Sequence, residues 1–210
     1  MPKLLIMTLR EAEKLDRAVC RARFPARCER AERFAHEEDR LRCLAAGALI
    51  HGALGIGEDE LVLGSRGKPG VKDGRRFFNV SHSGGFICCA ADDGPVGVDI
   101  ECVTAESEGV LRRVLNEEER NRVREKPSVF SLFWTLKEAV MKAEGLGFAL
   151  PPQTIDVLPA TRGEPVHVNG HEWHLRSLSL EGLPLSICCE HKFETPQPRF
   201  LTAEEAMKRD

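Results

Sequence analysis

The sequence has no long hydrophobic run. No apolar segment among its 210 residues approaches the ~20 residues that a membrane-spanning helix needs. The N-terminus also lacks the hydrophobic core and the cleavage site of a secretory signal peptide. We therefore expect a cytoplasmic protein that does not associate with a membrane.

A strong charge of either sign is also missing. The chain has 30 Lys and Arg against 33 Asp and Glu, which gives a formal net charge of -3. This balance argues against broad nucleic-acid binding, because proteins with that function carry a basic surface field. Basic residues gather only locally, between Arg21 and Arg33 and between Arg112 and Arg124. Each group is either a solvated helix face or a docking surface for an acidic partner.

Cysteine is plentiful, but the spacing that binds zinc is absent. The chain has 8 cysteines, and no two of them form a C-x-x-C pair. Cys88-Cys89 and Cys188-Cys189 are adjacent pairs within apolar runs. This pattern is typical of reduced, buried thiols.

Several segments occur twice in the same order along the chain. Arg33–Arg40 resembles Arg113–Arg120, and each precedes an apolar helix that ends in glycine. Phe86–Ala90 and Ser186–Glu190 resemble each other and are predicted to be buried strands. Matching segments in matching order indicate an internal duplication. The two predicted helices cover Leu41 to Gly55 and Phe130 to Gly147.

The duplication predicts an α+β fold made of two similar halves that are related by a pseudo-twofold axis. Each half would pack a long helix on a small antiparallel sheet. We expect an N-terminal half over residues 1–95 and a C-terminal half over residues 96–210. The chain would be a monomer that contains its own pseudo-dimer interface, and a binding site is expected between the halves.

Local signals predict further elements in the second half. Asn116 is the expected N-cap of a helix whose first turn has three glutamates. Pro127 is expected at the entry of the next helix. Turn residues bound two predicted strands, Thr154–Leu158 and Trp173–Leu178, and the motif Thr202-x-x-Glu205 predicts a short final helix.

One predicted strand ends in two carboxylates. Val96–Glu101 alternates between apolar and other residues and is rich in β-branched side chains, which predicts a strand. Asp99 and Glu101 are two positions apart and therefore face the same side of it. They could bind a hard cation, or they could form an ordinary solvated strand end.

One predicted helix offers a carboxylate and an ammonium group. Ser131–Gly145 has an apolar helical stripe, and Glu138 and Lys142, four positions apart, share a neighbouring face. They could form a simple surface ion pair worth only ~0.3 kcal/mol. Together with the two strand carboxylates, however, Glu138 could hold Mg²⁺, which leaves coordination positions open for substrate phosphates. Lys142 would then neutralise phosphate oxygens.

These segments and two others upstream are similar to the motifs of one enzyme family. The chain contains Gly67–Pro69, Phe77–Gly85, Gly97–Glu101 and Trp134–Lys142 in that order. With these motifs it resembles the 4′-phosphopantetheinyl transferases of the larger, surfactin-synthetase type, from about Arg27 to the C-terminal region. The resemblance implies a pseudo-dimeric fold with a coenzyme A site in the cleft between its halves.

The resemblance implies a reaction and a metal. The 4′-phosphopantetheine arm of coenzyme A would be transferred to a serine of an apo acyl or peptidyl carrier protein, with release of adenosine 3′,5′-bisphosphate. Asp99, Glu101 and Glu138 would bind Mg²⁺, or Mn²⁺ in its place, at the pyrophosphate. Lys142 would stabilise developing charge, and Glu138 would also accept the serine proton. Lys137 is expected to be a supporting cation.

The resemblance also implies where the nucleotide binds. Ser81 and His82 match family positions that hold the 3′-phosphate. The other expected contacts to phosphate or to the adenine pocket are basic side chains, which form charge-assisted hydrogen bonds with phosphate. They are Arg27, Arg30, Arg42, Lys68 and Lys142.

The chain departs from the family pattern at two places. Cys43 stands where relatives often have a hydroxyl group, so one hydrogen bond near the adenine pocket would be lost. Glu106 and Glu108 stand where relatives often have basic residues, which would change the preference for carrier proteins.

Two other functions stay open on the sequence alone. The chain could be a noncatalytic module that binds coenzyme A or a carrier protein, although a pure binder has no need of three clustered carboxylates. It could also be a metal-dependent nuclease, although the strand-borne E-x-K motif and a basic groove are missing.

Overall fold

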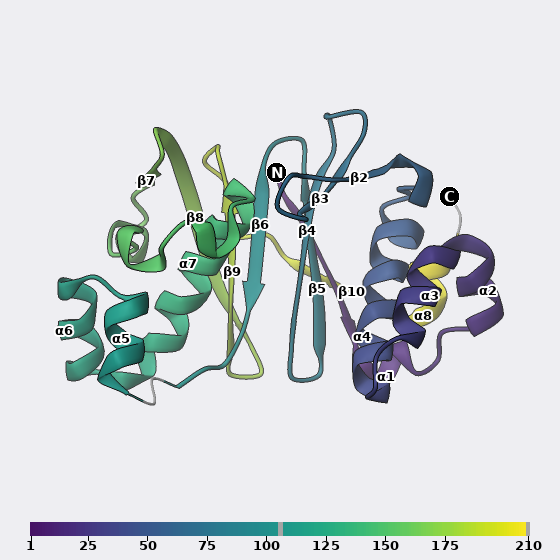
Figure 1. The fold of residues 1–210 in the computed structure, drawn as a ribbon, viewed down its shortest axis with the longest axis horizontal. Helices are drawn as coiled ribbons and strands as arrows, with labels where there is room; N and C mark the ends of the chain where they lie inside the picture. Colours follow the sequence, from purple (N-terminus) through teal and green to yellow (C-terminus); the bar gives the residue numbers. More distant parts are fainter. Residues whose placement is uncertain (105–106, 209–210) are drawn as a thin grey trace.

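We analysed a computed structural model of the chain, which describes residues 1–104 and 107–208. Two four-stranded sheets lie side by side in the middle of the molecule, and helices cover their outer faces at both ends (Figure 1). The predicted α+β fold of two sheet-containing halves is therefore confirmed. In the described part of the chain, no helix combines the length and the apolar character that a membrane crossing requires.

The first sheet has the strand order β10-β1-β5-β4. β1 (Lys3–Thr8) pairs antiparallel with β5 (Phe86–Asp92), which pairs antiparallel with β4 (Phe77–Ser83). A separate hairpin of β2 (Leu61–Leu63) and β3 (Pro69–Val71) leads into β4. The helices of this half are α1 (Leu9–Ala12), α2 (Arg17–Arg23), α3 (Pro25–Glu32) and α4 (Glu37–Gly47), with a π-helical turn η1 (Ala48–Ala53) and a 3₁₀ turn η2 (Glu58–Glu60).

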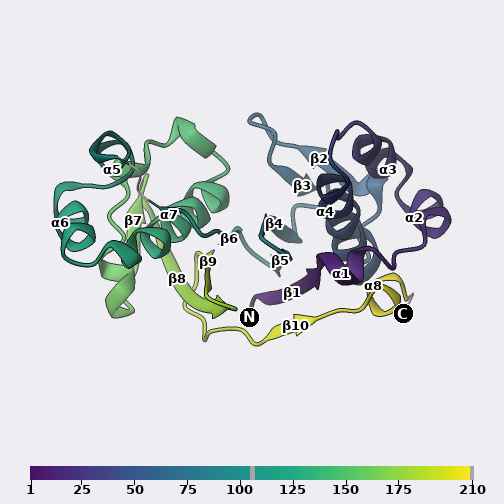
Figure 2. The ribbon, with the colours of Figure 1, turned by 90° about the horizontal axis from the view of Figure 1, so that it is seen from below.

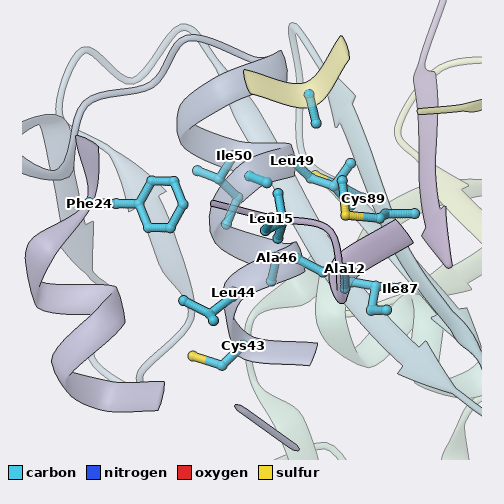
Figure 3. Packing of buried hydrophobic residues seen from close by; sticks show 14 of the residues in the cluster. Ala12, Leu15, Phe24, Cys43, Leu44, Ala46, Leu49, Ile50, Ile87 and Cys89 are labelled. Carbon is cyan, nitrogen blue, oxygen red and sulfur yellow. The ribbon is translucent and has the colours of Figure 1, made fainter. Parts of the chain in front are cut away.

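A hydrophobic core lies between the first sheet and its helices. Figure 3 shows Leu49 of η1 beside Cys89 of β5, and Leu44, Ile50 and Ile87 belong to the same core. All five side chains are buried. The long helix predicted from Leu41 onward thus packs on its sheet as expected, although its last part is π-helical.

The second sheet has the strand order β6-β9-β8-β7 and is antiparallel throughout. Its strands are β6 (Val96–Ile100), β7 (Val166–Val168), β8 (His171–Leu180) and β9 (Leu183–Cys189). Its helices are α5 (Glu108–Val114), α6 (Glu117–Glu125) and α7 (Phe130–Glu144). Short 3₁₀ turns lie at η3 (Pro127–Val129), η4 (Gly147–Ala149), η5 (Pro152–Thr154) and η6 (Pro159–Arg162).

Several local predictions for this half are confirmed. Asn116 caps α6, and its side-chain oxygen accepts a hydrogen bond from Glu119 N while the Glu119 carboxylate accepts one from Asn116 N. Pro127 begins the 3₁₀ turn that leads into α7, and Trp173–Leu178 lies within β8. α7 ends at Gly145, whose φ of 72° is the left-handed conformation that glycine adopts easily.

The strand predicted at Thr154–Leu158 is wrong. This segment begins with Thr154, the last residue of the 3₁₀ turn η5, and it joins no sheet. Buried side chains satisfy its backbone groups instead: Ile155 O accepts a hydrogen bond from Lys137, and Val157 N donates one to Glu119. The apolar residues at 155 and 157 are buried without strand pairing.

Besides the core under the helices of each half, a separate hydrophobic core joins the two halves. It buries residues of β1, β5, β6 and β9 that point away from the helices, among them Ile6, Cys88, Val98 and Ile187. Side chains alternate between this shared core and the helix-covered cores, as expected for strands with two buried faces. Of the 8 cysteines, all of which are free thiols, only Cys102 is exposed, so the prediction of reduced and mostly buried cysteines is confirmed.

The duplicated segments do not correspond residue by residue. Ile87 belongs to the core under α4, whereas Ile187, its counterpart in the sequence echo, belongs to the shared core. A shift of one residue reverses the faces of a strand, so the similar strands occupy different registers. The acidic echoes also differ, because Glu37 opens the long helix α4 itself whereas Glu117 opens α6, one helix before α7.

The C-terminal tail belongs to the first half, although we expected it within the second. β10 (Pro198–Phe200) pairs in parallel with β1, and α8 (Ala203–Met207) follows it. Figure 2 shows this tail crossing from the second half back to the first. α8, which begins with the predicted capping box of Thr202 and Glu205, packs against η1 so closely that a side chain on Gly52 would collide with Ala206 O.

Candidate active site at the junction of the two halves

The two sheets meet where β4 runs beside β6. Side chains of β4, rather than a backbone ladder, hold the strands together here: Val98 N donates to Asn79 Oδ1 at 3.0 Å, and Ile100 N donates to Ser81 Oγ at 3.3 Å. Polar groups of the first half thus reach the strand that was predicted to carry the acidic pair.

Asp99 and Glu101 both contact serines of β4 and so lie on one side of their strand, which agrees with the prediction from their spacing. Ser81 Oγ donates to Asp99 Oδ1 at 2.8 Å, and Ser83 Oγ donates to Glu101 Oε1 at 2.7 Å. Asp99 is buried and Glu101, directly after β6, is half-buried. Two serines with strand spacing therefore orient two carboxylates with the same spacing.

α7 brings a third carboxylate and an ammonium group to this point. The helix lies so close to β6 that an ideal Cβ on Gly97 would be 1.9 Å from Ala139 O and 2.7 Å from Ala143 N. Glycine is thus required by the close approach of helix and strand. The Lys142 ammonium donates to Asp99 Oδ1 at 2.6 Å and to Ser81 Oγ at 3.1 Å.

Glu138 lies in the field of the other two carboxylates. Burial raises the pKa of Glu138, the charges of Asp99 and Glu101 raise it further, and Lys142 opposes them. Its Oε1 atom is buried and has no hydrogen-bond partner, and the same is true of Asp99 Oδ2. Two buried oxygen atoms without partners, on neighbouring carboxylates, are what a hard cation would satisfy.

The carboxylates alone do not form a closed metal cage. Within residues 1–104 and 107–208, no three His, Cys, Asp or Glu side chains are arranged as a ready ligand cluster. Mg²⁺ commonly takes only part of its octahedral shell from protein carboxylates and the rest from water and substrate phosphates. The residues present fit that open type of site.

The predicted nucleotide contacts on β4 and α4 lie next to this cluster. His82 is on the α4 side of β4, and desolvation lowers its pKa, with the charges of Arg42 and Lys142 adding to the effect. Arg42 binds Asp39 at 2.8 Å and Glu38 at 2.9 Å, and its buried Nε atom has no partner. Ser81 differs from the expectation of a free phosphate ligand, because its hydroxyl group is already bound to Asp99 and Lys142.

The predicted nucleotide contacts on α3 lie next to α4, the helix that carries Arg42. Arg27 N donates to Glu58 at 2.8 Å, and the Arg27 side chain passes directly over Gly47 of α4. Arg30 is exposed on the same helix. Cys43 is buried with its thiol 3.8 Å from Arg27 O, so the structure brings these two sequence-predicted residues together.

Lys68 occupies an unexpected position. Its ammonium group donates to Ala143 O at 2.9 Å and to Val96 O at 3.3 Å, and burial lowers its pKa to about 8. Its expected contact with a phosphate stays a prediction.

Three arginines of the two basic regions form ion pairs with acidic neighbours. Arg21 pairs with Glu32, and both Arg112 and Arg124 pair with Glu108. These pairs agree with solvated helix faces, the simpler of the two interpretations of the basic regions. Glu106, the other acidic departure from the family pattern, lies outside the described residues.

The sequence reasoning missed Ser83 and Asn79 as site residues. Both share a strand face with Ser81, so strand alternation could have revealed them. It also left Lys137 as a supporting cation, whereas the structure buries it completely in an ion pair with Glu119 at 2.7 Å, away from the carboxylate cluster. Its role is to join α7 to α6 and η5.

Comparison with known proteins agrees with this geometry. Residues 95–188, which include β6, α7 and all but the last residue of β9, match the model of the 4′-phosphopantetheinyl transferase superfamily. The chain is 31% identical over 195 residues to the 4′-phosphopantetheinyl transferase psf-1 of Bacillus pumilus, covering 85% of this chain and 84% of that protein. The chain belongs to the 4′-phosphopantetheinyl transferase superfamily.

Other members of this superfamily are similar over different lengths. A 4′-phosphopantetheinyl transferase of Bacillus subtilis is 30% identical over 184 residues, which are 78% of this chain and 80% of the relative. The 4′-phosphopantetheinyl transferase Sfp of Bacillus subtilis is 30% identical over 145 residues. That match spans 63% of this chain and 65% of Sfp, slightly less than two thirds of the relative's length. The family resemblance read from the motifs is thereby confirmed.

Proposed function

We propose that this protein transfers the 4′-phosphopantetheine group of coenzyme A to a serine of an apo acyl or peptidyl carrier protein. The main support for this proposal is a pair of buried oxygen atoms without hydrogen-bond partners, one on Asp99 and one on Glu138, beside the Lys142 ammonium group. Membership of the superfamily supports the choice of substrates.

The proposed metal is Mg²⁺, held by Asp99, Glu101 and Glu138. When bound, it would supply Lewis-acid stabilisation of charge on the pyrophosphate oxygens. Lys142 already neutralises Asp99 and has its ammonium group directed into the same place, so it can donate to a phosphate oxygen there.

The proposed chemistry is a displacement at the β-phosphorus of coenzyme A. The serine oxygen of the carrier forms a new P–O bond, and the bond from this phosphorus to the bridging oxygen breaks. Adenosine 3′,5′-bisphosphate leaves with that oxygen. Glu138 is the proposed acceptor of the serine proton, because its carboxylate lies close to Lys142 and to the two carboxylates that would hold the metal with it.

The proposed nucleotide side of the site is in the first half. His82 and Arg42 would bind the 3′-phosphate, with Arg27, Arg30 and Ser81 nearby and Lys68 in a role considered below. The unpartnered Nε–H donor of Arg42 beside His82 supports an anion at this place.

Intact-mass measurement of an apo carrier protein tests the proposal. The carrier is incubated with the wild-type protein, coenzyme A and Mg²⁺, and a matched carrier in which the acceptor serine is replaced by alanine is the control. We expect the mass to rise by one phosphopantetheine group in the first carrier only, and not in the presence of a chelator. Binding of coenzyme A without a mass gain on acyl, peptidyl and polyketide carriers would instead indicate a noncatalytic module.

A further inference from the structure

Lys68 connects the first half to the two elements that carry the carboxylates of the second half. It lies at the end of the β2–β3 loop, where Gly64 N donates to Lys68 O at 2.9 Å and Gly67 N donates to Gly64 O at 2.9 Å. These bonds hold the backbone of the loop, and Gly67 has a positive φ of 80° that the turn requires. The starting point of the Lys68 side chain is therefore well defined.

The side chain then crosses to the end of α7. Figure 1 shows the β2–β3 hairpin at the same end of the molecule as the C-terminal end of this helix. The Lys68 methylene chain passes over Gly145, where an added Cβ would lie 3.2 Å from Lys68 Cδ. Its ammonium group reaches Ala143 O at 2.9 Å and Val96 O at 3.3 Å.

Both acceptors are backbone oxygens that need an external partner. Ala143 is in the last turn of α7, where carbonyl groups have no intrahelical donor and carry the negative end of the helix dipole. A cation is favoured at this position. Val96 is the first residue of β6, three residues before Asp99.

The same helix end is also anchored within the second half. Glu144 accepts hydrogen bonds from Trp173 Nε1 at 2.8 Å and from Asn169 Nδ2 at 3.3 Å. Lys68 thus binds the backbone of the last turn of α7 from the first half, in addition to the side-chain contact between Ser81 of β4 and Lys142. This turn contains Lys142, and Glu138 lies one turn earlier.

We propose that Lys68 is a positioning residue, which holds α7 and β6 in the register that places Glu138 and Lys142 against Asp99. This inference rests on the proposed function for its catalytic readout, and it differs from the role of a phosphate ligand that the family resemblance implied. In that other role the ammonium group would act on coenzyme A itself, whereas here it acts through the protein backbone.

Steady-state kinetics with coenzyme A and with 3′-dephospho-coenzyme A as phosphopantetheine donors separate these roles. Lys68→Met keeps the methylene chain and removes the ammonium group, and Lys72→Met, an exposed lysine after β3, is the matched control. We expect kcat of Lys68→Met to fall by roughly 10-fold or more, because small displacements of catalytic groups are costly. The KM for coenzyme A and its ratio to the KM for 3′-dephospho-coenzyme A should stay at the wild-type values. Lys68→Arg should recover part of kcat, since arginine also binds carbonyl groups at a helix end.

The opposite kinetic pattern would overturn the inference. A raised KM for coenzyme A together with loss of discrimination against the dephospho compound would identify a phosphate ligand. An unchanged kcat would show that the contact positions nothing.

Amide hydrogen exchange gives a readout that does not need transferase activity. Lys68→Met should exchange faster than wild type at the end of α7 and the start of β6, and Lys72→Met should not. If the wild type transfers nothing, the proposed function fails while this comparison still decides the anchoring role. Unchanged exchange at both places in Lys68→Met would refute it. Lys68→Leu, which also removes the ammonium group, provides the same comparison should the methionine variant not fold.

Discussion

The close packing of α7 on β6 leads to a quantitative prediction for Gly97→Ala. The added methyl group would lie 1.9 Å from Ala139 O and 2.7 Å from Ala143 N, whereas such contacts are practically never shorter than 3.0 Å. Both atoms belong to the helix backbone, so no side-chain rotation can relieve the collision. Helix and strand must move apart by roughly 1 Å, and overpacking of this kind typically costs about 1–3 kcal/mol of unfolding free energy.

The same displacement should reduce activity. It separates Glu138 and Lys142 on the helix from Asp99 on the strand, and a shift of about 1 Å in a catalytic group can lower kcat ~10²-fold. We therefore expect Gly97→Ala to remain folded but to lose most of its kcat, as measured by urea unfolding and by the carrier mass assay on the same preparation.

Gly94→Ala is the matched control for this prediction. Gly94 lies just before β6, and a Cβ at this position would meet no atom within 4 Å. The control should keep wild-type stability and kcat. The reasoning would be refuted if Gly97→Ala had both the stability and the kcat of wild type.

Three further predictions concern the fold. Lys137→Met should lower the free energy of unfolding in urea by about 3–5 kcal/mol, because it leaves the fully buried Glu119 without its cation. Lys126→Met, a change at an exposed lysine, should have almost no effect. An equally small effect of Lys137→Met would contradict the buried ion pair. Burial lowers the pKa of His51, so the unfolded chain binds the proton more readily and the unfolding free energy should fall as pH drops below about 6.5, by at most about 1.4 kcal/mol per pH unit. His51→Asn should weaken this dependence, and an identical pH profile in the variant would count against it. A thiol reagent should react rapidly with Cys102 alone in the native protein and with all eight cysteines after unfolding. Rapid labelling of native Cys102→Ser would contradict this prediction, because it would show that a second thiol is accessible.

The parts of the site that depend on local pattern could be predicted from the sequence. Strand alternation placed Asp99 and Glu101 on one side of β6, and helical spacing placed Glu138 and Lys142 on one face of α7. The caps at Asn116 and Gly145 have recognisable local chemistry as well.

The partners of charged side chains could not be predicted in the same way. Lys68 and Lys137 are both lysines beside motif residues, yet one binds the carbonyl groups of a distant helix end and the other a buried glutamate. The residues next to either lysine in the sequence do not indicate these partners, because the contacts form only when separate elements pack together. Lys68, which the family resemblance assigned to a phosphate, contacts Ala143 O and Val96 O in the structure.

Two fold-level errors have a similar cause. The tail from Pro198 onward carries a short strand with no alternation strong enough to assign it to a sheet, and its pairing with β1 spans almost the whole chain. The segment Thr154–Leu158 has a strand-like composition, but its backbone bonds to the side chains of Lys137 and Glu119 and not to a neighbouring strand. Tertiary contacts decided both outcomes against local propensity.

The most direct test of the central claim is single-turnover transfer by Glu138→Gln, followed by intact mass of the carrier, with coenzyme A binding measured on the same sample. Glu118→Gln, an exposed change on α6, is the matched control. If the junction cluster is the active site, Glu138→Gln binds coenzyme A with nearly wild-type affinity but transfers the arm at least ~10²-fold more slowly, since it loses both a metal ligand and the base. Transfer by Glu138→Gln at the wild-type rate would contradict the account.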